Sequence, residues 1–279
     1  MSLRIPPLLE PYLALPSEAS LILLTSVLGA SSNWLVLRFL HSSLTGSDGS
    51  SGAVEDESKV VLVSFMRDLA FWKEGGRRLG LDFDKLALKK RFAFVDGLSG
   101  LFLPRQNVAA SKGIEQRGLS SPKLENVSQE IQTAIQVLRD SPGSGKVLLV
   151  IDQLDLLIAA GSEQIGACNV GEMLMDLRED VHATILSISA DQPLVSGHHT
   201  PLELDHAAFL LNTAHQADFI MGLRLLDTGT ARDVSGVLRV TVGDKTEEDK
   251  EDIQKRMEER ELLFFVGGDG GVKVFERGQ

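Results

Sequence analysis

The stretch that decides the fold class is Val147-Leu148-Leu149-Val150-Ile151, one of five short apolar runs in this 279-residue chain. The other four lie at residues 21–25, 60–64, 92–95 and 183–188. Strands that are apolar along nearly their whole length are buried on both faces, as in a parallel sheet covered by helices. The runs therefore predict an α/β fold with a mainly parallel central sheet.

Segments with a helical pattern separate these runs. Apolar side chains recur in them every three or four residues, as they do on one face of a helix. Trp34, Leu37 and Leu40, for example, fall on one side of such a helix. The pattern predicts flanking helices over residues 32–43, 67–79, 123–139 and 169–178.

The pattern changes after about residue 215. Leu238, Val240 and Val242 alternate with polar or small residues, which is typical of an antiparallel strand with one face in water. Residues 262–266 and 272–275 flank a glycine-rich segment and predict a hairpin. We therefore expect the parallel sheet to be extended by C-terminal antiparallel strands.

A single domain over residues 1–279 is expected, because no linker interrupts the alternation of strands and helices. Residues 1–16 form an N-terminal extension in this prediction. Three segments rich in glycine, polar or charged residues are expected to be mobile loops or inserts, namely 45–58, 104–122 and 244–260.

Composition limits the function. The chain has 39 acidic and 28 basic residues and a net charge of −11. Affinity for nucleic acid depends on neutralised phosphates, so this balance argues against a standalone nucleic-acid-binding protein and leaves room for a local basic loop. The single cysteine, Cys168, cannot form an internal disulfide, which indicates a cytoplasmic or nuclear protein. Because no signal peptide or membrane-spanning stretch is recognisable, we expect no membrane contact.

The loop after residues 21–25 is where a nucleotide-binding protein of this class carries its phosphate loop. A working loop, G-x-x-x-x-G-K-[ST], holds phosphates with backbone N–H groups and a lysine. Residues 26–33 read SVLGASSN and contain one glycine and no lysine. Gly29, Ser31 and Ser32 are thus candidate nucleotide contacts of a degenerate site, and capping of the next helix is the alternative role for the two serines.

Asp152 follows the run at 147–151 and resembles a Walker B carboxylate, which would hold Mg²⁺ through water. Any buried strand that ends in aspartate fits this pattern, so a capping or pairing role is the alternative. Asp155 lies three residues further on and is expected to form a surface pair with it. Residues 142–146 (PGSGK) look like half a phosphate loop, but they follow a helix and precede a strand, so we interpret them as a turn.

Metal and nucleophilic chemistry find no support in the residue patterns. His198, His199 and His206 fall in one segment, but their spacing fits no metal-ligand pattern and predicts a solvated loop. Cys168 has no catalytic signature around it, and the chain has no G-x-S-x-G elbow. We therefore identify no catalytic residue, no metal ligand and no cofactor.

Four segments show a family resemblance that covers about residues 10–277. They are Ser64-Phe65-Met66-Arg67-Asp68 with Phe71-Trp72, then residues 77–82 (RRLGLD), 91–102 (RFAFVDGLSGLF) and 149–155 (LVIDQLD). With these segments the chain resembles the fungal form of the Elongator complex protein 6 family. The resemblance implies a RecA-like fold without usable Walker motifs.

The resemblance also implies partners and a cellular role. It places the chain with two sibling subunits, Elongator proteins 4 and 5, in a heterohexameric ring that works with the catalytic Elongator subunits. That ring binds tRNA, couples ATP hydrolysis to its handling and supports the modification of wobble uridines. The modification chemistry itself belongs to a different subunit.

Candidate tRNA contacts follow from analogy with ATPases of this fold, in which loops after the fourth and fifth strands face the centre of the ring. Here these loops are residues 158–170 and 190–204, and the second contains His198 and His199. It holds no lysine or arginine, so Arg105, Lys112 and Arg117 are the alternative contacts.

Three readings of function remain open on the sequence. The first is a non-catalytic RecA-like ring subunit. The second is a self-sufficient ATPase with a degenerate phosphate loop, for which the missing lysine is the discriminating feature. The third, a nucleic-acid-binding recombination paralogue, requires a basic patch that the charge balance does not supply. Phe71 and Trp72 belong either to the core or to a subunit interface.

Overall fold

The structure is a computed structural model. It describes residues 5–45, 58–102, 116–119, 121–143, 145–161, 165–196, 199–227, 229, 231–243 and 258–277.

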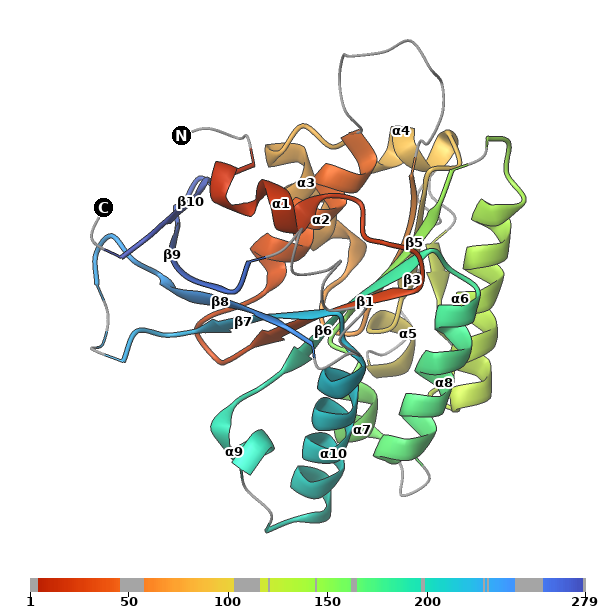
Figure 1. Cartoon of the computed structure of the whole chain (residues 1–279). Coiled ribbons are helices and arrows are strands. Elements are labelled where there is room, and N and C mark those ends of the chain that lie inside the picture. The colour runs from red at the N-terminus through yellow and green to blue at the C-terminus, as the bar shows by residue number, and fades with distance from the viewer. Residues whose placement is uncertain are drawn as a thin grey trace.

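The described residues form one ten-stranded sheet in the order β10-β9-β8-β7-β1-β6-β5-β2-β3-β4 (Figure 1). Neighbouring strands from β7 to β4 are parallel, and β7 to β10 are joined in antiparallel pairs. The strands are β1 (Ser20–Ser26), β2 (Lys59–Ser64), β3 (Phe92–Asp96), β4 (Gln116–Gly118), β5 (Val147–Asp152), β6 (Ala183–Ser189), β7 (Phe219–Arg224), β8 (Gly236–Val242), β9 (Arg260–Val266) and β10 (Val272–Phe275).

Helices cover both faces of the sheet, as the apolar strands predict (Figure 1). One face packs against a short 3₁₀ helix (Pro7–Leu9), α1 (Glu10–Leu13), α2 (Asn33–Thr45), α3 (Leu69–Arg78) and α4 (Phe83–Leu88). The other packs against α6 (Leu124–Arg139), α7 (Leu156–Ala160), α8 (Ala167–Glu179) and α10 (Pro201–Gln216). Two further helices lie in connections, α5 (Ser99–Phe102) and α9 (Gln192–Ser196).

Strand β1 shows how the sheet divides the core. Ile22 and Leu24 belong to the cluster under α2 and α3, whereas Leu21 and Leu23 belong to the cluster under α6 and α10. All four side chains are fully buried. Because successive residues of a strand point to opposite faces, an uninterrupted apolar run supplies both layers at once.

The predicted α/β fold with C-terminal antiparallel strands is confirmed. The hairpin is present, with Val266 opposite Val272 in β9 and β10. Two predictions are corrected. Residues 190–204 are not a simple loop, because α9 occupies Gln192–Ser196 and α10 begins at Pro201. Residues 158–170 likewise include the end of α7 and the start of α8.

Helix α10 begins with a capping box that the sequence analysis missed. The Thr200 hydroxyl accepts a hydrogen bond from the Glu203 N–H, and the Glu203 carboxylate accepts one from the Thr200 N–H. Pro201 follows at the first helical position, where it breaks no hydrogen bond of the helix. The motif T-P-x-E at residues 200–203 could have revealed the start of this helix.

Most of the segments predicted to be loops or inserts, 45–58, 104–122 and 244–260, lie outside the described residues, as do residues 1–4 of the predicted extension. That residues 1–279 form a single domain stays a prediction. Across the described ranges, every helix is too short or too polar to cross a bilayer.

Candidate functional site

The candidate nucleotide site lies where β1, β5 and β6 end, since the carboxyl ends of parallel strands meet at one edge of the sheet. After β1 the chain makes a tight turn from Val27 to Ala30, closed by a hydrogen bond of 2.9 Å from the Ala30 N–H to the Val27 carbonyl. Gly29 has a φ of +93°, which favours glycine. A four-residue turn leaves no wide ring of N–H groups around a phosphate.

Asp191 places a carboxylate directly on this turn. It follows β6, the neighbour of β1, and its Oδ1 accepts a hydrogen bond of 2.8 Å from the Leu28 N–H. In a phosphate loop such an N–H would face the nucleotide. Here the N–H of Leu28 already donates to the Asp191 carboxylate. A negative charge at this position repels phosphate. The sequence analysis missed Asp191, because this contact depends on β6 lying beside β1 in the sheet.

Apolar side chains surround the same turn. Leu28 is 87% exposed. Leu225, after β7, packs over Gly29, and an added Cβ would lie 3.4 Å from its Cδ1, an ordinary van der Waals contact. The loop itself, residues 26–33, contains no lysine or arginine, and the chain has no lysine before Lys59.

The two serines after the turn serve the start of α2. The Ser31 hydroxyl accepts a hydrogen bond of 3.2 Å from the Asn33 N–H. Ser32 is buried, and its carbonyl accepts hydrogen bonds from the Leu35 and Val36 N–H groups. The Ser31 contact is of the helix-capping kind, whereas the buried Ser32 hydroxyl has no hydrogen-bond partner among the described residues, so capping by Ser32 stays a prediction.

Asp152, at the end of β5, is fully buried. Its Oδ2 accepts a hydrogen bond of 2.8 Å from the Ser64 hydroxyl, and its Oδ1 accepts one of 3.1 Å from the Ser187 hydroxyl. Burial raises the pKa of Asp152 to about 6, against the lowering effect of the two hydroxyls. The carboxylate therefore ties β2, β5 and β6 together, as the pairing alternative has it, and is turned to protein donors rather than to open solvent.

Asp155 corrects the expectation of a surface pair. It is buried, and its Oδ2 accepts a hydrogen bond of 3.2 Å from the Ser189 N–H and lies 3.1 Å from His206 Nε2. His206 is also buried, in α10, so the predicted solvated loop is wrong for this histidine. The pair fastens α10 to the ends of β5 and β6.

The turn at residues 142–146 holds a cation rather than an anion. Lys59 is buried at the start of β2, and its Nζ donates hydrogen bonds to the carbonyls of Leu138, Ser141 and Gly143 at 3.0, 3.0 and 3.2 Å. The Leu138 carbonyl lies in the last turn of α6, and Ser141 and Gly143 follow the C-terminal end of this helix, where the helix dipole favours positive charge. The interpretation of this segment as a turn is consistent with that arrangement.

Comparison with known proteins identifies the family. The family model described as Elongation complex protein 6 matches residues 51–260, about three quarters of the chain. The chain belongs to this family. The Elongator complex protein 6 homolog of Schizosaccharomyces pombe is 22% identical over 236 residues, which cover 81% of this chain and 83% of the relative.

A solved structure gives the same fold. The KaiC-like protein of Pyrococcus horikoshii superimposes with a TM-score of 0.57 and 17% identity, covering 92% of this chain and 90% of its own. This likeness shows a RecA-like fold. The member of the Elongation complex protein 6 family described here is therefore an Elongator subunit with a RecA-like fold.

The predicted tRNA contacts of this Elongator subunit are not brought together by the described residues. His198, Arg105 and Lys112 lie outside them. His199 is exposed before α10, and its N–H donates to the Glu203 carboxylate at 2.8 Å. Arg117, on the edge strand β4, forms an ion pair of 3.7 Å with Glu130.

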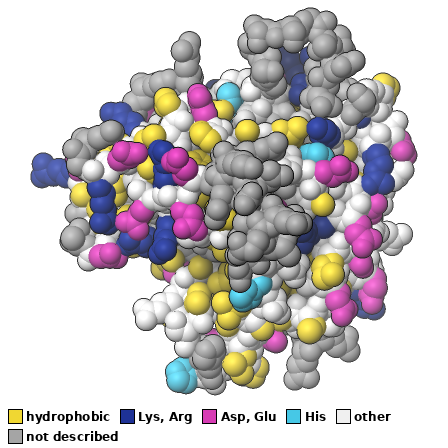
Figure 2. Space-filling model, in the orientation of Figure 1, with side chains coloured by type: hydrophobic (Ala, Val, Ile, Leu, Met, Phe, Trp, Pro, Cys, Tyr) yellow, Lys and Arg dark blue, Asp and Glu magenta, His cyan; other side chains and the backbone are white. Residues whose placement is uncertain are grey.

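The charge distribution agrees with the acidic composition. Figure 2 shows basic and acidic side chains interspersed over the antiparallel strands, and mainly acidic ones at the opposite edge beside α6 and α8. In the part of the chain that the structure describes, no three His, Cys, Asp or Glu side chains gather as metal ligands would. At the ends of β5 and β6, Asp152 and Asp155 hydrogen-bond to residues of neighbouring strands and of α10.

Proposed function

We propose that this chain is a non-catalytic member of a heterohexameric Elongator ring, built with Elongator proteins 4 and 5, that binds tRNA and supports wobble-uridine modification. Family membership supports an Elongator subunit. The observation that carries the non-catalytic role is the turn after β1, which is closed on itself and hydrogen-bonded to the Asp191 carboxylate.

The buried carboxylates support the same proposal. A hydrolase would need Asp152 to face Mg²⁺, and here two serine hydroxyls take one oxygen each. The RecA-like core in this view serves as a scaffold for neighbouring subunits. Any contact with tRNA is made by the assembled ring, because the chain alone carries a net charge of −11.

Co-expression with the two sibling subunits tests this proposal. Native mass spectrometry should show one discrete assembly that holds two copies of each chain. The assembly should then retard tRNA in a gel at low salt, with binding that weakens steeply as salt rises. A chain that stays apart from its siblings would overturn the ring, and an assembly that ignores tRNA would overturn the tRNA role.

A further inference from the structure

A cavity of about 440 Å³ lies away from the degenerate nucleotide site, between α2, α3 and the β9–β10 hairpin. This volume is within the usual range of ligand pockets. Its apolar walls are formed by Trp34 and Leu37 of α2, Phe71 and Leu79 at α3, and Val266 and Val272 of the hairpin. Such a concave apolar surface suits one large apolar side chain.

Two aromatic side chains make the wall specific. Phe71 is 38% exposed, whereas its neighbour Trp72 is fully buried, so the aromatic pair divides between core and surface. Trp34 is held from behind by Phe264, with ring centroids 5.1 Å apart. An apolar side chain that enters here would contact rings already fixed by packing, which lowers the entropic cost of binding.

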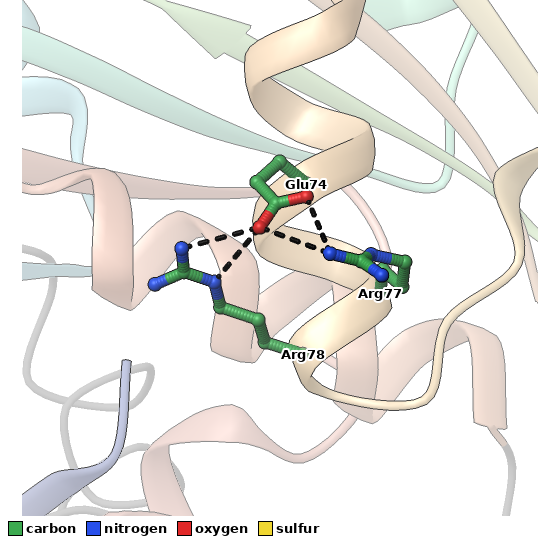
Figure 3. A network of polar contacts seen from close by, with 3 residues as sticks. All are labelled: Glu74, Arg77 and Arg78. Atoms are coloured by element: carbon green, nitrogen blue, oxygen red, sulfur yellow. Dashed lines mark hydrogen bonds and ion pairs between the residues drawn. The ribbon is translucent and has the colours of Figure 1, made fainter. Parts of the chain in front are cut away.

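The polar rim of the pocket has a positive excess. Glu74 and Arg78 of α3 line it together with the buried Arg38 of α2. The Glu74 carboxylate accepts hydrogen bonds from both Arg77 and Arg78 at 3.0–3.2 Å, so one anion is shared by two guanidinium groups (Figure 3). These bonds lower the pKa of Glu74, Arg77 contributing first. Because Glu74 is shared between two arginines, Arg78 keeps N–H donors for a second carboxylate.

Arg78 is also positioned by the hairpin. A Cβ on Gly270 would lie 3.2 Å from Arg78 Cδ, so the glycine makes room for this arginine. Its φ of +80° also favours glycine. The hairpin turn and α3 thus bring an arginine to the edge of an apolar cavity.

We infer that this pocket docks a segment of a partner protein that carries one large apolar side chain next to a carboxylate. The apolar side chain enters between Trp34 and Phe71, and the carboxylate contacts Arg78. A protein partner fits because the chain is a subunit of a protein complex. The inference rests on that membership and not on the proposed handling of tRNA.

The test uses the ¹⁵N-labelled full chain and short synthetic probes. The Trp34 indole signal reports on the pocket; because Trp72 packs edge-to-face on Phe71, backbone amide signals of α8, on the other face of the sheet, serve as the internal reference. Acetyl-Phe-Asp-amide should shift the Trp34 signal. Acetyl-Phe-Asn-amide should bind about fivefold more weakly, because it lacks the charge, and acetyl-Ala-Asp-amide about tenfold more weakly, because it lacks the ring.

Two arginine variants give a matched comparison. Arg77 and Arg78 both bind Glu74, but only Arg78 lines the pocket. Arg78→Gln should weaken the Phe-Asp probe about fivefold and leave the Phe-Asn probe unchanged, whereas Arg77→Gln should change neither by more than twofold. Equal effects of the two variants, or no binding of the Phe-Asp probe, would overturn the inference. Tenfold tighter binding of free 3-phenylpropionate would overturn it in favour of a small-molecule site.

Discussion

Replacing Asp152 by Asn tests whether this carboxylate is a structural group. Burial raises the pKa of Asp152 from the ordinary 3.8 to about 6, so the folded protein holds a proton on this carboxyl more tightly than the unfolded chain does. A carboxyl group whose pKa is higher in the folded than in the unfolded state stabilises the fold at low pH. This stabilisation is lost as the pH rises through the folded-state pKa. The full pKa difference corresponds to a loss of about 3 kcal/mol in the free energy of unfolding. About half of this loss, ~1.5 kcal/mol, occurs between pH 5 and pH 8.

Urea denaturation at pH 5 and pH 8, followed by tryptophan fluorescence, measures this effect as a difference of unfolding free energies. The wild type should lose about 1.5 kcal/mol more than Asp152→Asn between the two pH values. The amide can still accept a bond from one serine and donate one to the other. Asp176→Asn, at an exposed site in α8, is the control for general charge effects. A wild type that gains stability over Asp152→Asn at pH 8 would refute the reasoning, because the anion would then be the favoured form.

Two further predictions concern the anchors of the fold. Lys59→Met should lower the unfolding free energy by about 2 kcal/mol in urea titrations, because three carbonyls lose a charged donor; unchanged stability would show that the ammonium is dispensable. Gly243→Ala should cost more than about 2 kcal/mol, since its Cβ would lie 1.7 Å from the Ala217 carbonyl oxygen. Gly268→Ala meets no atom within 4 Å and is the matched control, so similar losses in both variants would contradict the packing argument.

The sequence predicts the fold well where burial decides the pattern. Residues 147–151 form a fully buried strand because β5 has neighbours on both sides and helices on both faces. The sequence analysis predicts neither strand β7 nor its pairing with β1, and in the structure the burial of this strand alternates along its length. It is parallel to β1 and antiparallel to β8, so one strand joins the two kinds of sheet.

The site was only partly predictable. The missing lysine is visible in residues 26–33, and it correctly directs attention to the turn after β1. The role of Asp191 depends on β6 lying beside β1, which is a property of strand order and not of local sequence. The contact between His206 and Asp155 likewise depends on the tertiary fold, because the two residues lie 51 positions apart in the sequence. The apolar cavity is lined by α2, α3 and the hairpin together, so no single segment of the sequence predicts it.

The most direct test of the account is calorimetric titration of the purified chain with MgATP. The closed turn, the Asp191 carboxylate on the Leu28 N–H and the buried Asp152 predict no saturable binding at millimolar nucleotide. Saturable binding that Asp152→Ala abolishes, with the variant still folded, would contradict the account and establish a self-sufficient nucleotide site.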